Sequence, residues 1–274
     1  MKYIYLAISI ILFTSCEDVI DLPLTEGPKR LVIDANINWK KDKPGAEQSI
    51  KISTTSGFYD LTVPVVNGAI VKVLNIDSND VFDFDEENNT GIYKTDRFIP
   101  VLNNKYQLTV EYEGETFTAE ETMISVPSII VDRIEQTSDN VFGTESIKVE
   151  FFYQDTENAE NFYLGQFSYP EFNIDKYRTR NDQFSDGSEN SFFVQDELLI
   201  PGETLTFYLY GASERNFNYM DLLLDQTRSG GPFATPPAAV KGNCINETNP
   251  DKKPYGYFRL SQMSKIEYEI KEIE

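Results

Sequence analysis

Residues 108–119 read LTVEYEGETFTA, and this stretch carries the clearest fold signal in the chain. Apolar and polar residues alternate on both sides of Glu113-Gly114, as in two antiparallel strands that each bury one face. The glycine supplies the positive φ that a tight hairpin turn needs. The stretch therefore predicts a β-hairpin.

The same period of two recurs on the N-terminal side of this hairpin. Short alternating runs cover residues 31–38, 49–54, 69–75, 81–84 and 91–95. About seven short strands in roughly 95 residues, separated by clusters of Gly, Pro, Asn and Asp, are typical of an immunoglobulin-like or transthyretin-like β-sandwich. We therefore predict a mainly β chain with a β-sandwich domain over residues 30–127.

A second β-rich domain is expected over residues 128–274. Its strands are predicted at residues 129–136, 147–153, 162–169, 192–194, 204–210, 255–261 and 265–270. One helix is expected near residues 213–227, because Ser213 is a suitable N-cap and an apolar stripe follows it. Residues 173–190 are polar and are expected to form a long loop.

Residues 1–15 have the pattern of a signal peptide. Lys2 precedes an apolar run over residues 4–13, which is shorter than the roughly 20 residues that span a bilayer. Cys16 directly follows small residues, as in a bacterial lipobox, where the thiol receives lipid. An ordinary secretory signal followed by a chance cysteine is the alternative. We expect lipidation at Cys16 and an extended acidic tether over residues 16–29.

Charge and composition exclude several classes of function. The formal net charge is -21, and the chain contains no histidine. A strongly acidic protein is repelled by phosphate backbones, so no nucleic-acid partner is expected. The missing imidazole excludes Ser-His-Asp and Cys-His catalysis and His-ligated metal sites. We expect no enzymatic activity and no cofactor.

Several motifs, taken together, resemble a known lipoprotein family. They are Cys16-Glu17-Asp18, Leu31-Val32-Ile33-Asp34, Lys241-Gly242-Asn243-Cys244-Ile245-Asn246 and Gly256-Tyr257-Phe258. This ordered set is similar to the Bacteroidota family called domain of unknown function 4249. The resemblance implies an outer-membrane lipoprotein, often encoded beside a TonB-dependent receptor, with Glu17 and Asp18 as an acidic export signal. It implies no catalytic residue.

An acidic run offers a candidate calcium site. Asp83, Asp85 and Glu87 alternate along the chain, and carboxylate oxygens are the hard ligands that calcium prefers. The glycine that an EF-hand loop has at its sixth position is Asn88 here. A solvated acidic hairpin is the alternative.

Cys244 is the only cysteine besides Cys16. If Cys16 carries lipid, no disulfide can form within the chain. Cys244 then either stays a buried, inert thiol or pairs with another chain.

The segment around residues 173–190 is the candidate partner surface. Tyrosine and arginine are frequent anchors of binding surfaces, although aromatic rings also fill sandwich cores. Long polar loops are more often recognition elements than idle connections. The candidate residues there, and in the proline-rich stretch that follows the helix, are Tyr169, Phe172, Tyr177, Arg178, Arg180 and Phe233.

These observations predict a lipoprotein anchored in the outer membrane, displayed on the cell surface, that binds rather than catalyses. Its expected partner is a TonB-dependent outer-membrane receptor. Two alternatives stay open: a secreted or surface hydrolase that uses a carboxylate pair, and a structural surface adhesin. A pocket with two carboxyl groups at hydrolytic separation would distinguish the hydrolase.

Overall fold

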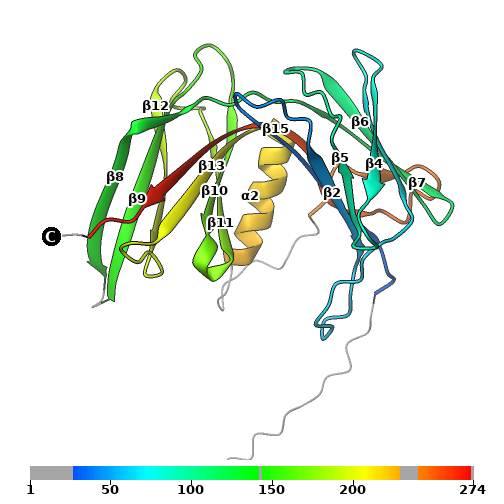
Figure 1. Ribbon diagram of the computed structural model, residues 1–274, viewed down its shortest axis with the longest axis horizontal. Coiled ribbons are helices and arrows are strands. Elements are labelled where there is room, and N and C mark those ends of the chain that lie inside the picture. The colour runs from blue at the N-terminus through cyan, green and yellow to red at the C-terminus, as the bar shows by residue number, and fades with distance from the viewer. Residues whose placement is uncertain (1–26, 142–143, 229–239, 273–274) are drawn as a thin grey trace, which may run out of the picture.

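The computed structural model describes residues 27–141, 144–228 and 240–272. In these ranges the fold is mainly β, as predicted, with one sheet of twelve strands and one of three. Figure 1 shows these strands as an arch with a group of strands on either side. The expected signal peptide, together with Cys16, Glu17, Asp18 and Phe233, lies outside the described residues.

The first group of strands forms a β-sandwich. It contains β1 (Leu31–Lys40), β2 (Gln48–Thr54), β3 (Ile70–Asn75), β4 (Val81–Glu86), β5 (Ile92–Thr95), β6 (Lys105–Tyr112), β7 (Glu115–Thr122) and β14 (Ile245–Asn246). β4 pairs with β5 over only two residues, so the large sheet folds over at this corner and encloses a core. The predicted hairpin is confirmed as β6–β7, with Gly114 at a φ of 76° in its turn.

The second group packs a three-stranded sheet against the other end of the large sheet. Its elements are β8 (Ile129–Val141), β9 (Thr144–Gln154), β10 (Phe162–Tyr169), the short 3-10 helix η1 (Pro170–Phe172), β11 (Ile174–Asn181), β12 (Glu189–Asp196) and β13 (Thr204–Ala212). Strands β12, β9 and β8 form the small sheet. Phe151 of β9 stacks on Phe207 of β13 with ring centroids 4.7 Å apart, which places a second core between the sheets.

One long strand, β15 (Tyr255–Glu269), belongs to both groups. Its first part pairs in parallel with β1, from Tyr255 opposite Val32 to Met263 opposite Lys40. Its last part pairs antiparallel with β13. The sequence predicted two strands here and placed them in the second region, whereas residues 255–263 complete the sheet of the first sandwich. In Figure 1, β15 runs across the top of the arch between the two groups.

The prediction of a loop over residues 173–190 is wrong for the first half of this segment, which forms the edge strand β11. β11 pairs with β10 along its whole length, from Ile174 opposite Tyr169 to Asn181 opposite Phe162. A polar sequence is compatible with an edge strand, because such a strand has few buried positions and is protected from aggregation by charge. Residues 182–188 make the turn into β12.

The helix α2 (Glu214–Arg228) lies in the hollow of the arch, beneath β15 (Figure 1). Ser213 caps it as expected, because its hydroxyl accepts a hydrogen bond from the amide of Asn216 at 3.2 Å. The helix packs on β11, β10 and β13, and Thr179 of β11 donates a hydrogen bond to Asp221 at 2.6 Å. Over the three described ranges, no helix has both the length and the apolar character that crossing a membrane requires.

Candidate binding surface

The inner face of the arch is built by the alternation of β1. Ile33, Ala35 and Ile37 are fully buried in the first core. The intervening residues Asp34 and Asn36 therefore point to the opposite face of the sheet, toward the hollow that holds α2. Burial and the charge of Asp34 together raise the pKa of Tyr219 on α2.

Arg259 of β15 lies at the floor of this face and is buried. Its guanidinium donates hydrogen bonds to Asn36 at 3.1 Å, to Asn38 at 2.9 Å and to Ser261 at 3.2 Å. It also lies 4.4 Å from the centroid of the Tyr210 ring. Burial lowers the pKa of Arg259, but a guanidinium stays protonated in proteins. A permanent positive charge is therefore held under the polar surface.

The charge of Arg259 acts on its neighbours. Burial raises the pKa of Asp34, and the positive charges of Arg259 and Lys51 oppose that rise. Asn36 donates a hydrogen bond to Asp34 as well as accepting one from Arg259. These contacts fix the orientation of the amide groups that face the hollow.

A groove of about 720 Å³ continues this surface over β1, β2 and β5. It is lined by amide, hydroxyl, acidic and basic side chains: Asn36, Asn38, Glu47, Gln48, Ser49, Asp85, Lys94, Thr95, Asp96 and Arg97. Such a mixed set can both donate and accept hydrogen bonds. The groove is therefore suited to a polar ligand or to a polar segment of another protein.

The structure separates the predicted partner residues of β11 into two faces. Arg178 donates to the carbonyl of Phe193 at 3.1 Å, and Arg180 donates to Asn190 at 3.0 Å. Both arginines thus connect β11 to the region of β12. Tyr177 lies on the other face of β11, which it shares with Thr179, and Thr179 donates to Asp221 of α2 in the hollow.

The remaining predicted partner residues have different positions. Tyr169 is buried, and its hydroxyl donates to Asp196 at 3.2 Å. Phe172 is partly exposed in η1. Of the predicted set, only Tyr177 contributes to the inner face of the arch, and the other described members lie at the second sandwich.

The candidate calcium residues Asp83, Asp85 and Glu87 do not form one cluster. Asp83 lies 3.6 Å from Lys72, and Glu87 accepts a hydrogen bond from Lys94 at 2.7 Å. Their carboxylate oxygens do not all lie within 4.8 Å of one another, as the oxygens around one ion would. The arrangement favours the alternative of a solvated acidic hairpin.

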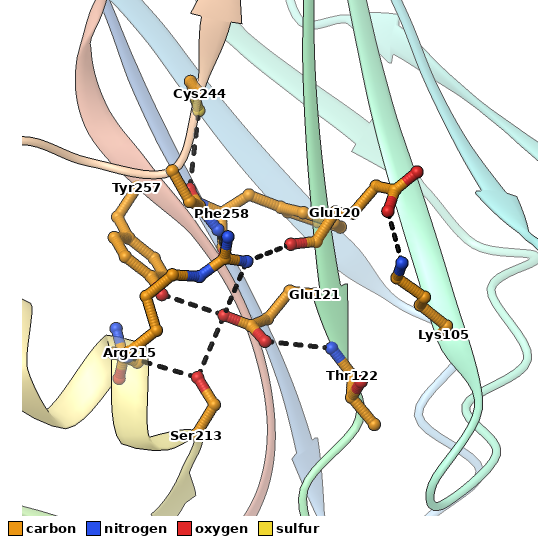
Figure 2. Close-up of polar contacts among 11 residues, drawn as sticks. Lys105, Glu120, Glu121, Thr122, Ser213, Arg215, Cys244, Tyr257 and Phe258 are labelled. Carbon is orange, nitrogen blue, oxygen red and sulfur yellow. Dashed lines mark hydrogen bonds and ion pairs between the residues drawn. The ribbon is translucent and has the colours of Figure 1, made fainter.

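A polar cluster joins the first sandwich to the start of α2 (Figure 2). Its centre is the buried carboxylate of Glu121 on β7. This carboxylate accepts hydrogen bonds from Tyr257 at 2.8 Å and from Ser213 at 3.0 Å, and it lies 3.5 Å from Arg215. Residues from β7, β15 and α2 therefore meet at one charge. We call Glu121, Ser213, Arg215 and Tyr257 the polar joint.

Cys244 lies beside this joint and is a free, buried thiol. Burial raises its pKa to about 12, although the charge of Arg215 opposes the rise. A thiolate is the reactive form of cysteine, so this thiol is a poor nucleophile at neutral pH. The geometry agrees with the inert-thiol alternative.

The motifs that suggested the family surround the same place. Asn243 accepts a hydrogen bond from the amide of Phe258 at 2.8 Å and donates one to its carbonyl at 2.7 Å. A Cβ on Gly242 would lie 1.6 Å from the carbonyl oxygen of Gly256, so the two segments can cross here only because residue 242 is glycine. These motif residues hold β15 and β14 in place, and sequence reasoning assigned them no such role.

The fold and the site define a mainly β protein of two joined sandwiches with a polar inner face. The chain belongs to the family described as domain of unknown function (DUF4249), whose model matches residues 17–267. No curated protein matches it significantly.

Among solved structures, the similarities are weak. A two-domain fibronectin type III segment of chicken tenascin is 11% identical with a TM-score of 0.21, and the match covers 62% of this chain and 86% of that chain. A DUF4785 family protein from Legionella pneumophila is 14% identical, with 66% and 51% covered and a TM-score of 0.21. A pullulanase from Anoxybacillus sp. complexed with maltotriose is 10% identical, with 65% and 24% covered and a TM-score of 0.21. No function is transferred from these proteins.

Proposed function

We propose that this chain is a lipid-anchored protein of the outer membrane of Bacteroidota, displayed at the cell surface. It binds a partner and performs no reaction itself. The partner is a TonB-dependent outer-membrane receptor, to which the chain acts as an accessory component. The lipobox-like Cys16 and the acidic Glu17-Asp18 support the anchor and the surface location.

The observation that carries the proposal is an exposed apolar loop next to the point where the chain enters the fold. We define the apolar loop as residues 57–65, between β2 and β3. Phe58 is 82% exposed and Leu61 is 102% exposed, and Tyr59, Val63 and Val65 are also exposed. Such a group of exposed apolar side chains is unusual on a soluble surface and is typical of contact sites.

The chain just before the apolar loop is hydrogen-bonded to the end of the expected tether. The amide of Thr55 donates to the carbonyl of Arg30 at 2.9 Å, and the amide of Arg30 donates to the hydroxyl of Thr55 at 3.1 Å. In Figure 1 the loop projects away from the arch on the side where the described chain begins. A lipid at Cys16 would therefore hold this side of the molecule toward the membrane.

Basic residues surround the same place. Lys29 is exposed next to Arg30, and the Arg30 guanidinium donates to the carbonyl of Lys253 at 3.4 Å. Lys252 and Lys253 are exposed as well. Acidic residues share this place, because Asp60 lies in the loop and Lys252 pairs with Glu115 at 2.8 Å. The exposed apolar side chains are therefore the part of this surface that suits a lipid–water interface, where aromatic rings enter the head-group region. The inner face of the arch then stays free for the partner.

Membrane fractionation and co-purification test the proposal. The lipidated chain is expected in the outer-membrane fraction, and Cys16→Ser is expected to lose that location. Mild detergent is expected to recover an outer-membrane barrel with the wild type. Recovery of the unmodified Cys16 thiol by mass spectrometry would overturn the anchor, and recovery of no barrel would overturn the partner.

The apolar loop has its own test, independent of the anchor. The unlipidated Cys16→Ala chain is mixed with vesicles that contain phosphatidylglycerol, and the bound fraction is measured by co-sedimentation. Phe58→Ser with Leu61→Ser is expected to reduce binding severalfold, whereas the exposed Val131→Ser on β8 is not. Equal binding by both variants would exclude membrane contact by the loop.

A further inference from the structure

Three aspartates from two separate connections meet at one end of the second sandwich. Asp155 directly follows β9, whereas Asp182 and Asp186 lie in the turn between β11 and β12. Each aspartate offers one carboxylate oxygen, and these three oxygens all lie within 4.8 Å of one another. Oxygen ligands lie 2.3–2.6 Å from calcium, so two ligands of one ion are separated by at most about 5 Å. The three carboxylates therefore have the spacing of a shared ion.

The burial of this cluster is costly without a cation. Asp155 is 4% exposed and Asp182 is 2% exposed. The ion pairs from Arg133 to Glu189, from Lys148 to Glu150 and from Lys176 to Asp196 neutralise other carboxylates of the second sandwich. The nearby Arg180 is directed to Asn190 and to the carbonyl of Ser191 instead. Buried carboxylates that repel one another require a positive charge or strong hydrogen bonds.

The hydrogen bonds that the cluster receives leave oxygen sites open. The amide of Gly187 donates to Asp155 at 2.9 Å, and the amide of Asn161 donates to Asp182 at 2.9 Å. The amide of Asn158 donates to Asp186 at 3.0 Å. These amides bind one oxygen of each carboxylate, and the Tyr163 hydroxyl binds the other oxygen of Asp155. An ionised carboxylate has about four lone-pair sites, so lone pairs remain on all three. Each aspartate can therefore still bind a cation.

A buried tyrosine gives a second, independent indication. Tyr153 is fully buried, and its hydroxyl has no hydrogen-bond partner. Tyr153 precedes Asp155 by two residues in extended chain, so both side chains lie on the same face.

The neighbouring Tyr163 connects Tyr153 to the cluster. The two tyrosine rings pack edge to face with centroids 5.0 Å apart. Tyr163 donates hydrogen bonds to Asp155 at 2.5 Å and to Asn161 at 2.9 Å. A buried hydroxyl without a hydrogen-bond partner is rare in proteins. A bound ion would account for this one, because a water molecule on the ion, or a ligand oxygen that the ion draws in, would accept its hydrogen bond.

We propose that Asp155, Asp182 and Asp186 bind one calcium ion, which joins the β9–β10 and β11–β12 connections. All candidate ligands are oxygens, including the side-chain carbonyl of Asn161, and a purely oxygen site selects calcium or magnesium rather than zinc. Loop ligands that approach from two connections suit the flexible coordination of calcium better than the strict octahedron of magnesium. This site is distinct from Asp83, Asp85 and Glu87.

Metal titration of the purified full chain tests this proposal. After treatment with a chelator, the chain is titrated with calcium chloride by calorimetry, and its thermal unfolding is measured with and without calcium. One calcium per chain and a higher Tm are expected. Terbium is expected to luminesce when the tyrosines are excited, because Tyr153 and Tyr163 adjoin the site, and calcium is expected to displace it.

Variants assign the site. Asp186 is exposed, so Asp186→Asn is expected to fold and to weaken calcium binding at least tenfold. The matched control Asp83→Asn with Asp85→Asn removes two exposed carboxylates elsewhere and is expected to bind as wild type. No heat and no change in Tm at millimolar calcium would overturn the proposal. Unchanged binding by Asp186→Asn, or tighter binding of magnesium than of calcium, would also overturn it.

Discussion

Tyr257 of β15 donates a hydrogen bond of 2.8 Å to Glu121 of β7, and this contact ties the shared strand to the first sandwich (Figure 2). The same carboxylate accepts a hydrogen bond from Ser213, which caps α2. The charge next to Tyr257 and its burial raise the pKa of its hydroxyl, so it stays a donor at neutral pH. One buried acid thus fixes a strand and a helix start relative to each other.

The polar joint is expected to stabilise the protein. Glu121→Gln removes the charge that three donors share and should cost about 1–3 kcal/mol of the free energy of unfolding, measured by urea denaturation. The control is Glu120→Gln. The neighbouring Glu120 forms an exposed pair with Lys105 and accepts a hydrogen bond from Gln107 at 3.3 Å, so this change should cost less than about 1 kcal/mol. Equal losses in the two variants would contradict a special role for Glu121.

Stability is expected to fall at acid pH partly through Asp196. Burial alone would raise the pKa of Asp196, but hydrogen bonds from Lys176 and from the amide of Leu198 hold it below its ordinary value of 3.8. A lowered pKa in the folded state gives stability that is present above the unfolded pKa. That stability is lost as the pH falls through the folded pKa.

The variant Asp196→Asn should therefore lose stability at neutral pH and show a shallower fall in Tm between about pH 5 and pH 2. Asp175→Asn, an exposed position on the edge strand β11 of the large sheet, is the control and should keep the wild-type slope. A wild-type slope in Asp196→Asn would show that this group does not contribute.

Gly256 is expected to tolerate no side chain. Its φ is 95°, and a Cβ would lie 2.0 Å from the carbonyl oxygen of Ile33 on β1. Gly256→Ala should lower the free energy of unfolding by about 1–3 kcal/mol or more, measured by thermal and urea unfolding. Gly27→Ala, where a Cβ meets nothing within 4 Å, should leave it unchanged. A stable Gly256→Ala protein would mean that β15 can shift away from β1.

Cys244 is expected to resist alkylation in the folded protein. Its burial and its pKa of about 12 leave very little thiolate at neutral pH. Iodoacetamide labelling followed by mass spectrometry should give slow modification of native protein and fast modification in urea. Rapid native labelling, or a disulfide-linked dimer on a non-reducing gel, would instead support pairing with another chain.

Sequence patterns predicted those parts of the fold that depend on local alternation. Most strands and the α2 helix follow directly from the spacing of apolar residues and from the Ser213 cap. β11 was missed because an edge strand with exposed charges lacks an apolar face. The sequence predicted two strands in place of β15, because the pairing of this strand changes near Met263. There it leaves β1 and continues along β13.

The inner face of the arch could not be predicted in this way. Arg259 and Asn36 lie 223 residues apart in the chain, and only the parallel pairing of β15 with β1 brings them together. The cluster of Asp155, Asp182 and Asp186 likewise joins two turns that no spacing rule connects. Tyr177 was expected in a loop, whereas it lies in the edge strand β11.

The sharing of β15 has a consequence for how the molecule acquires its shape. During synthesis β1 emerges long before the strand that must lie beside it, so the first sandwich stays incomplete while more than half of the chain is made. Pairings this distant in sequence form slowly. An export machinery that needs an unfolded substrate would benefit from that delay, because neither sandwich can complete its sheet before β15 has been made.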